Sequence, residues 1–291
     1  MHRRDAIRLL GSMTLIPLAD CARRAAASVP APVGDRGGAP GTAPVAGIQL
    51  YTLRTVLEKD PEPVLQALGR IGYREVEMAG RYGKSAAEFR AMLDRAGLRA
   101  PSTHIPIDQL SGAALDQSIA DAKVLGNEWI VCPWLDESMR TPDGFNRLVD
   151  VLNQAGQRVH AAGLRFAYHN HDFEFKPLPD GMLPYDMLLS RTDADRVKME
   201  MDLYWITKAG KDPIAYMTRY PGRITLVHVK DMDASGNMAD VGQGRIDFAR
   251  IFAADPAIEH YFVERDDAPN PVENARVSYA ALSRLLGAVA R

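Results

Sequence analysis

The chain has 291 residues, of which 46% are hydrophobic and 25% charged, with a formal net charge of −2 at pH 7. This is the balance of an ordinary globular protein, and it gives no basic surplus for a nucleic-acid partner. Two cysteines, Cys21 and Cys132, are too few for a disulfide framework.

Residues 1–27 have the order of an export signal. Arg3 and Arg4 precede an apolar run at 9–19 that is too short to span a bilayer, and small residues follow. The pattern resembles a twin-arginine signal, so we expect a periplasmic protein. Residues 18–21 also resemble a lipobox, from which Asp20 departs, with cleavage near residues 25–27 as the alternative. We therefore expect membrane attachment only if Cys21 is lipidated.

Residues 28–46 are rich in Pro, Gly and Ala and predict a linker. From residue 47 onward, short apolar runs alternate with amphipathic helical stretches. The predicted strands are 47–53, 75–79, 99–105, 129–133, 165–170, 197–203, 224–230 and 260–265. Helical stretches between them include 63–72, 85–97, 115–126 and 145–163, and the last is 274–290. Eight such units predict an α/β fold, a single-domain (β/α)8 TIM barrel over 47–291. A doubly wound open sheet is the alternative, but no Gly-rich phosphate loop follows the first strand.

Polar side chains accumulate where the predicted strands end. Such groups are costly in apolar runs unless they are paired or bind a metal. In a (β/α)8 barrel the carboxyl ends of all strands meet at one mouth, which carries the active site. The residues in this position are Gln49, Tyr51, Glu77, His104, Trp134, His169, His171, Asp202, His228, Lys230, Glu264 and Arg265.

A divalent-metal site is the sharpest hypothesis for this mouth. Its ligands would be Asp202, His228, Glu264 and one histidine of the fifth strand, His169 or His171, which face the same side. Mixed imidazole and carboxylate ligation suits Mn²⁺, Co²⁺, Zn²⁺ or Fe²⁺ better than Ca²⁺. Each residue also has a structural alternative. The aspartate could cap a helix, His228 could be a core histidine, and the glutamate could pair with a neighbouring cation.

Several segments together resemble the sugar phosphate isomerase/epimerase family of xylose isomerase-like TIM barrels. They are GIQLYTLR (47–54), Glu77, THIP (103–106), YHNHDFEF (168–175), MDLYW (201–205), VHVKD (227–231) and VER (263–265). The resemblance implies one metal ion held by residues of strands five to eight, and it carries three of the ligands onto Asp202, His228 and Glu264. Strand five departs from the family, because Tyr168-His169 stands where a Leu-Glu pair is expected. One of the two acid/base glutamates of the ketose epimerases is thereby lost.

The resulting expectation is a metal-dependent enzyme acting on an unphosphorylated sugar or keto-sugar through a metal-stabilised enediolate. The candidates for proton transfer or charge stabilisation are Glu264, His169, His171, His104 and Lys230. The candidates for substrate binding are Tyr51, Glu77, Trp134, Asn170, Glu174, Trp205 and Arg265, and Glu174 is also a candidate for orienting a strand-five histidine.

The fate of the enediolate distinguishes the reactions. Reprotonation gives isomerisation or epimerisation, our leading expectation, whereas loss of a β-substituent gives a dehydratase or keto-glycoside lyase. A non-catalytic periplasmic sugar-binding barrel is a further alternative. An abasic-site endonuclease is disfavoured, because it would need a basic DNA-facing surface. The sequence is compatible with an oligomer.

Overall fold

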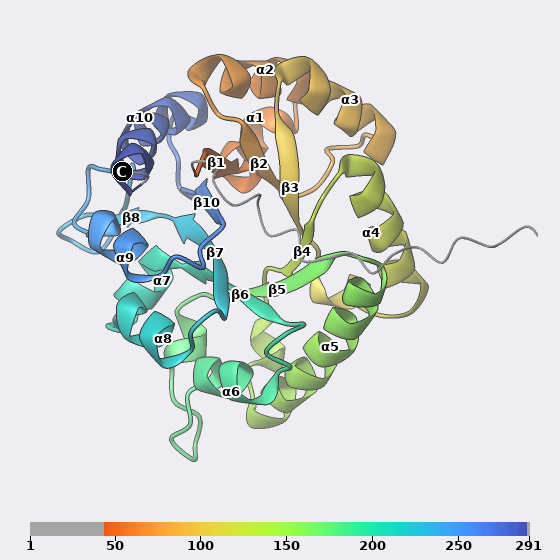
Figure 1. Ribbon diagram of the computed structural model, residues 1–291, viewed down its shortest axis with the longest axis vertical. Helices are drawn as coiled ribbons and strands as arrows, with labels where there is room; N and C mark the ends of the chain where they lie inside the picture. The colour runs from red at the N-terminus through yellow and green to blue at the C-terminus, as the bar shows by residue number, and fades with distance from the viewer. Residues whose placement is uncertain (1–43, 290–291) are drawn as a thin grey trace, which may run out of the picture. The chain divides into compact units, whose positions relative to one another are not determined.

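The computed structural model describes residues 44–289, which form a closed barrel of parallel strands inside a ring of helices (Figure 1). The order around the barrel is β1-β10-β7-β6-β5-β4-β3-β2. The strands are β1 (Ala46–Gln49), β2 (Glu75–Met78), β3 (Arg99–His104), β4 (Trp129–Cys132), β5 (Arg165–His169), β6 (Lys198–Asp202), β7 (Ile224–Val229) and β10 (His260–Val263). The predicted (β/α)8 barrel is confirmed. The predicted export signal, Cys21 and most of the predicted linker lie outside the described residues.

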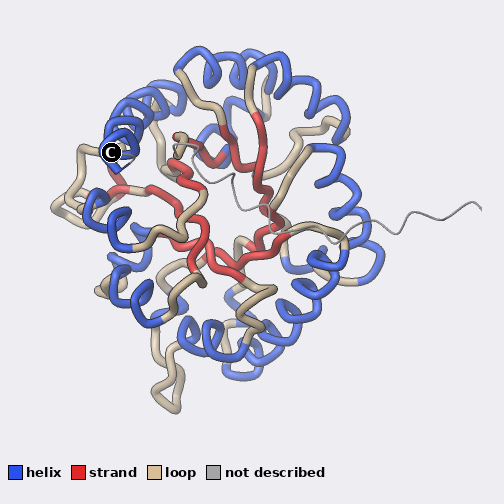
Figure 2. Tube along the Cα trace, viewed as in Figure 1, coloured by secondary structure: helices blue, strands red, loops and turns tan. Residues whose placement is uncertain are grey.

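Figure 2 shows the helices outside and the strands inside. The helices are α1 (Arg54–Leu57), α2 (Pro61–Ile71), α3 (Ala86–Ala96), α4 (Gly112–Leu125), α5 (Pro142–Ala161), α6 (Pro184–Arg191), α7 (Leu203–Lys208), α8 (Pro213–Arg219), α9 (Phe248–Ala254) and α10 (Pro271–Val289). Local chemistry sets their ends. A capping box of Ser85 and Glu88 begins α3, and Gly97 ends it at a φ of 68°. None of the helices in residues 44–289 is long and apolar enough to span a bilayer.

The first strand is shorter than the predicted 47–53. The Gln49 side chain accepts a hydrogen bond from the Tyr51 backbone N–H, and a 3-10 helix, Leu50–Leu53, begins there. Helices α6, α8 and α9 had not been delimited by the apolar pattern, because each has only seven or eight residues. A short antiparallel pair, β8 (Asp231–Met232) and β9 (Met238–Ala239), follows β7.

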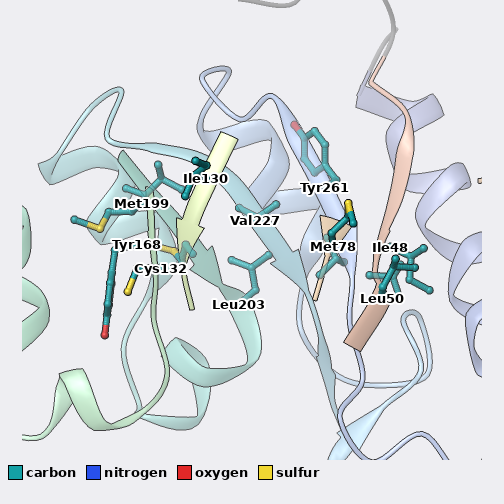
Figure 3. Packing of buried hydrophobic residues seen from close by; sticks show 14 of the residues in the cluster. Ile48, Leu50, Met78, Ile130, Cys132, Tyr168, Met199, Leu203, Val227 and Tyr261 are labelled. Atoms are coloured by element: carbon teal, nitrogen blue, oxygen red, sulfur yellow. The ribbon is translucent and has the colours of Figure 1, made fainter. Parts of the chain in front are cut away.

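The core has two parts because successive strand residues face opposite sides of the sheet. Outward residues such as Ile130, Cys132 and Val227 belong to the large cluster under the helices (Figure 3). A smaller cluster, Trp129, Val131, Ala167, Leu226 and Phe262, comes from the alternate positions of the same strands. On β5, β6 and β7 these alternate positions become polar toward the C-terminal end of the strand. The sequence pattern predicts apolar runs. In the structure, the strands are apolar on their outward positions and polar at the mouth.

Charged side chains also occupy the N-terminal end of the barrel, in pairs and small groups. Buried Glu75 accepts a hydrogen bond from His260 Nδ1 at 2.8 Å and pairs with Arg99, which also lies 3.4 Å from Glu128. The Arg165 guanidinium forms two hydrogen bonds with Glu259 and lies 3.8 Å from the ring centroid of Trp129. This end of the barrel is closed by small, separate ion-pair groups.

Candidate active site

Four side chains at the C-terminal end of the barrel, which we call the mouth quartet, converge on one point. They are His169, Asp202, His228 and Glu264, and one ligand atom of each lies within 4.8 Å of the others. They come from the ends of β5, β6, β7 and β10, which are consecutive around the barrel. His169 Nε2 lies 3.9 Å from Asp202 Oδ2, and His228 Nδ1 lies 2.8 Å from Glu264 Oε2.

The mouth quartet fits a divalent transition metal. All four residues are buried, and two imidazoles with two carboxylates suit Mn, Co, Zn or Fe. Asp202 also has its alternative role, because its Oδ1 accepts from the backbone N–H groups of Tyr204 and Trp205 and caps α7. Its other oxygen, Oδ2, receives no hydrogen bond within the described part of the chain. One oxygen therefore starts the helix, and the other faces the quartet.

Lys230 provides a cation beside the quartet. Its Nζ lies 2.7 Å from Glu264 Oε2, 3.1 Å from Asp202 Oδ2 and 3.0 Å from Asp266 Oδ1. Burial disfavours the ammonium, but the surrounding carboxylates outweigh this and hold the pKa of Lys230 well above its usual value. Burial likewise opposes ionisation of Glu264, yet Lys230 and His228 keep its pKa below the usual range. Both groups are charged at neutral pH.

Two more carboxylates, Glu77 and Glu200, lie behind the imidazoles. His228 Nε2 is 2.6 Å from Glu77 Oε2 and 3.2 Å from Glu200 Oε2. His169 Nδ1 is 3.2 Å from Glu200 Oε2. His104 Nε2 lies between the two carboxylates, 2.8 Å from Glu200 and 3.1 Å from Glu77. Burial lowers the pKa of His104, but the facing carboxylates raise it to about 9, so this imidazole is protonated.

Aromatic rings form one wall of the mouth. The His171 ring packs edge-on against Trp134 at 4.6 Å and lies 5.0 Å from the His169 ring and 5.5 Å from Trp205. Burial and the charge of Lys230 lower the pKa of His171 to about 3, so its imidazole is neutral. Trp134 and Tyr51 keep 42% and 43% of their surface exposed, although both follow barrel strands. Exposed rings at a barrel mouth are suited to stacking on a sugar.

Three predicted substrate contacts have another use in the structure. Glu77, Asn170 and Glu174 are each 0% exposed. The Asn170 Oδ1 accepts from the Asp202 N–H at 3.2 Å, and Glu174 accepts from the Tyr168 hydroxyl and the His171 N–H at 2.7 and 2.8 Å. In this structure these side chains hold the site together, and the bond from the His171 N–H to Glu174 fits the predicted orienting role of Glu174. Substrate contact by the three residues stays a prediction.

Arg265 is bound to protein carboxylates. Its guanidinium donates to Asp240 and Asp267 at 2.8 and 2.9 Å. Two residues beside the quartet, Glu200 and Asp266, had not been singled out from the sequence. Glu200 stands two positions before Asp202 and therefore faces the same side of β6, a spacing that would have indicated it.

The geometry defines a (β/α)8 barrel with a polar, metal-compatible cluster at its mouth, and comparison with known proteins gives the family. Residues 65–254 match the family model of the xylose isomerase-like TIM barrels, and the chain belongs to that family.

Among curated proteins, the inosose dehydratase of Lacticaseibacillus casei is 26% identical over 196 residues, 59% of this chain and 63% of that protein. The match thus spans less than two thirds of that relative's length. A sugar phosphate isomerase/epimerase structure from Parabacteroides distasonis has a TM-score of 0.72 and 26% identity, covering 84% of this chain and 97% of its own. The IolI protein with a bound zinc atom has a TM-score of 0.64 and 15% identity, covering 84% and 99%, and shows a likeness of fold alone.

Proposed function

We propose that this protein is a metal-dependent lyase that removes water from an unphosphorylated cyclic keto-sugar. The observation that carries the proposal is the convergence of the mouth quartet beside a neutral imidazole, His171, and a charged ammonium, Lys230. The names of the curated relatives support dehydration. A divalent ion held by the quartet would act as a Lewis acid on the substrate's carbonyl and adjacent hydroxyl oxygens.

The chain's own groups supply the proton transfers. The ring of His171 and the Nζ of Lys230 each lie 5.5 Å from the Trp205 ring, so both are beside Trp205 at the mouth. The neutral imidazole accepts the proton from the carbon next to the carbonyl, leaving an enediolate. The enediolate then re-forms the carbonyl, while its C=C electron pair shifts to the next bond, makes a new C=C bond there and expels the hydroxyl group of the next carbon. This hydroxyl takes a proton from Lys230 and leaves as water. Solvent restores both groups, and no oxidant is needed.

Isomerisation or epimerisation through the same enediolate is the second candidate. The solved relative named sugar phosphate isomerase/epimerase favours it, since that structure is covered almost completely. Two-base epimerisation needs an acid/base group on each face of the carbon. Here β5 contributes His169 where the epimerases have a carboxylate, and this difference favours elimination.

The cations around the mouth support an unphosphorylated substrate. Arg54 donates to the Tyr51 and Asp266 carbonyls, and Arg140 donates to the Leu135 carbonyl while lying over Trp134. Lys230 and Arg265 are bound by carboxylates, as described above. Each of these four side chains already has a protein partner, whereas a phosphate would need cations free to bind it.

The test is to incubate the purified full-length chain, loaded in turn with Mn²⁺, Co²⁺, Zn²⁺ and Fe²⁺, with an inosose in D₂O. Dehydration predicts loss of one water by mass spectrometry and a conjugated enone in the ultraviolet spectrum. Deuterium incorporation at constant composition would instead identify isomerisation. Binding of the sugar with neither change would leave a non-catalytic sugar-binding barrel.

We also propose export to the periplasm, with membrane attachment only through a lipidated Cys21. The support is the Arg3-Arg4 pair and the apolar run that follows it. Replacing both arginines by lysine is expected to retain the protein in the cytoplasm, as cell fractionation would show. Unchanged delivery of that variant would contradict a twin-arginine route, and a lipid-sized mass increase on a Cys21 peptide would demonstrate the anchor.

A further inference from the structure

We infer that Glu77 and Glu200 are positioning residues that fix the His228 and His169 rings so that each presents its other nitrogen to the mouth quartet. The inference rests on the proposed metal site. It assigns these two buried carboxylates to metal affinity without direct ligation, although Glu200 also forms a second candidate ligand group with His104, His169 and His228.

His228 shows the arrangement most clearly. Its Nε2 lies 2.6 Å from Glu77 Oε2, and its Nδ1 faces Glu264, a member of the quartet. An imidazole that donates from one nitrogen keeps a lone pair on the other. A carboxylate that accepts this N–H fixes the tautomer and ring orientation and makes the metal-facing nitrogen more basic. In this structure Nδ1 also donates to Glu264 Oε2 at 2.8 Å, so an ion bound at Nδ1 would displace that proton. Glu77 holds the other proton on Nε2 and so leaves Nδ1 as the ligand atom.

His169 has a similar arrangement on the neighbouring side, but without the hydrogen bond. Its Nδ1 lies at an ion-pair distance of 3.2 Å from Glu200 Oε2, which favours a proton on Nδ1, while its Nε2 lies 3.9 Å from Asp202 Oδ2. The two histidines use opposite nitrogens, Nδ1 of His228 and Nε2 of His169, for the quartet. Without a fixed tautomer, either ring could present an N–H to the ion and fail to bind it.

The two carboxylates are themselves held in place. Glu77 accepts from Gln49 Nε2 at 2.8 Å and from the Ser102 hydroxyl at 2.5 Å. His104 joins the pair, since its Nε2 lies within 3.1 Å of both carboxylates. Glu77 and Glu200 are 0% exposed and lie behind the imidazoles. Their remaining role is toward the imidazoles.

Glu75 supplies a matched control on the same strand. It lies two residues before Glu77, is also buried, and accepts from an imidazole, His260 Nδ1, at 2.8 Å. No ligand cluster adjoins His260 within the described residues. Replacing Glu75 therefore disturbs the same type of buried pair on the same strand without touching the metal site.

The experiment measures Co²⁺ binding to the full chain by chelator competition, with the visible spectrum of the loaded protein as a second readout. Glu77→Gln and Glu200→Gln are each expected to weaken Co²⁺ binding about 10- to 100-fold and to change the spectrum at saturating ion. Glu75→Gln is expected to lower thermal stability and leave affinity and spectrum at parental values. If Glu77→Gln does not fold, Gln49→Ala combined with Ser102→Ala frees the same carboxylate and is expected to weaken binding in the same direction.

Parental affinity and spectrum in the Glu77 and Glu200 variants, while His228→Ala loses the ion, would overturn this inference alone and leave the proposed metal site intact. Two equivalents of Co²⁺ in the parent, with one lost in Glu200→Gln, would overturn it by making that carboxylate a ligand. Weakened Co²⁺ binding in both variants of a protein that does not dehydrate an inosose would uphold the inference and reject the proposed reaction.

Discussion

Glu75 and Glu77 lie on one strand, and each is buried against a histidine, yet they serve opposite ends of the barrel. At the N-terminal end, Glu75 pairs with His260 and Arg99, Arg99 also pairs with Glu128, and Arg165 is matched by Glu259. At the mouth, carboxylates and imidazoles share their partners, and Lys230 alone serves three carboxylates. Small separate ion-pair groups close the N-terminal end, whereas at the mouth ligand atoms from four residues converge on one point, as a metal site requires.

The strongest test of this contrast replaces one histidine at each end. His228→Ala removes a quartet ligand, so bound metal should fall from about one equivalent to a trace. Because loss of a group behind a ligand already costs 10- to 100-fold, loss of the ligand itself should reduce activity by more than about 100-fold. His260→Ala should keep metal and activity while lowering the melting temperature. Elemental analysis, kinetics and calorimetry measure all three, and equal metal loss in both variants would contradict the contrast.

A pH titration tests the free-energy cost of burying an ionised Glu174 beside the mouth. Burial raises the pKa of Glu174 from 4.5 to about 7. Between these values the folded protein keeps a proton that the unfolded chain has released, so stability falls as pH rises from about 4.5 to about 7. The shift corresponds to a loss of about 3 kcal/mol in unfolding free energy. Urea unfolding at pH 5 and pH 8 should show this loss in the parent and a smaller one in Glu174→Gln, and equal losses would refute it.

At the closed end, Arg165→Ala should affect stability alone. The variant loses two charge-assisted hydrogen bonds to Glu259 and the contact with the Trp129 ring. Because both partners are partly solvated, we expect a decrease of about 2 kcal/mol in the free energy of unfolding. Denaturant melts measure the decrease. Metal content and kcat should stay at parental values, and a change in either would show that the two ends are coupled.

The smallest effect is expected at the exposed rings of the mouth. Trp134→Ala should raise KM about fivefold, or about 1 kcal/mol, with metal content unchanged, because it removes only a stacking surface. Tyr51→Ala should act in the same direction. Steady-state kinetics on the proposed inosose substrate measures the change, and an unchanged KM in both variants would show that these rings are not part of the binding site.

The fold could be predicted because its signal is local. Outward strand residues such as Val227 and Met199 are apolar wherever helices cover them, and polar side chains mark the strand ends. The positions of Asp202, His228 and Glu264 followed from these ends and from barrel closure. All three ligand candidates, together with His169, fall in one cluster.

The partners of the buried carboxylates could not be predicted. Glu77 and His228 are 151 residues apart in the chain and meet only across the closed barrel. A sequence pattern shows that Glu77 lies at a strand end, but not that other buried side chains form hydrogen bonds with its carboxylate oxygens. The hydrogen-bond partners of Asn170 and Glu174 could not be predicted either, because they depend on how the loop after β5 folds.

Lys230 has a consequence for the order of assembly. Its ammonium offsets the repulsion among Asp202, Glu264 and Asp266, so the mouth needs no ion to bring these charges together. If the quartet binds an ion as proposed, the polypeptide can therefore complete its barrel first and take up the ion afterwards. The bound ion would then take over from Lys230 part of the neutralisation of these carboxylates.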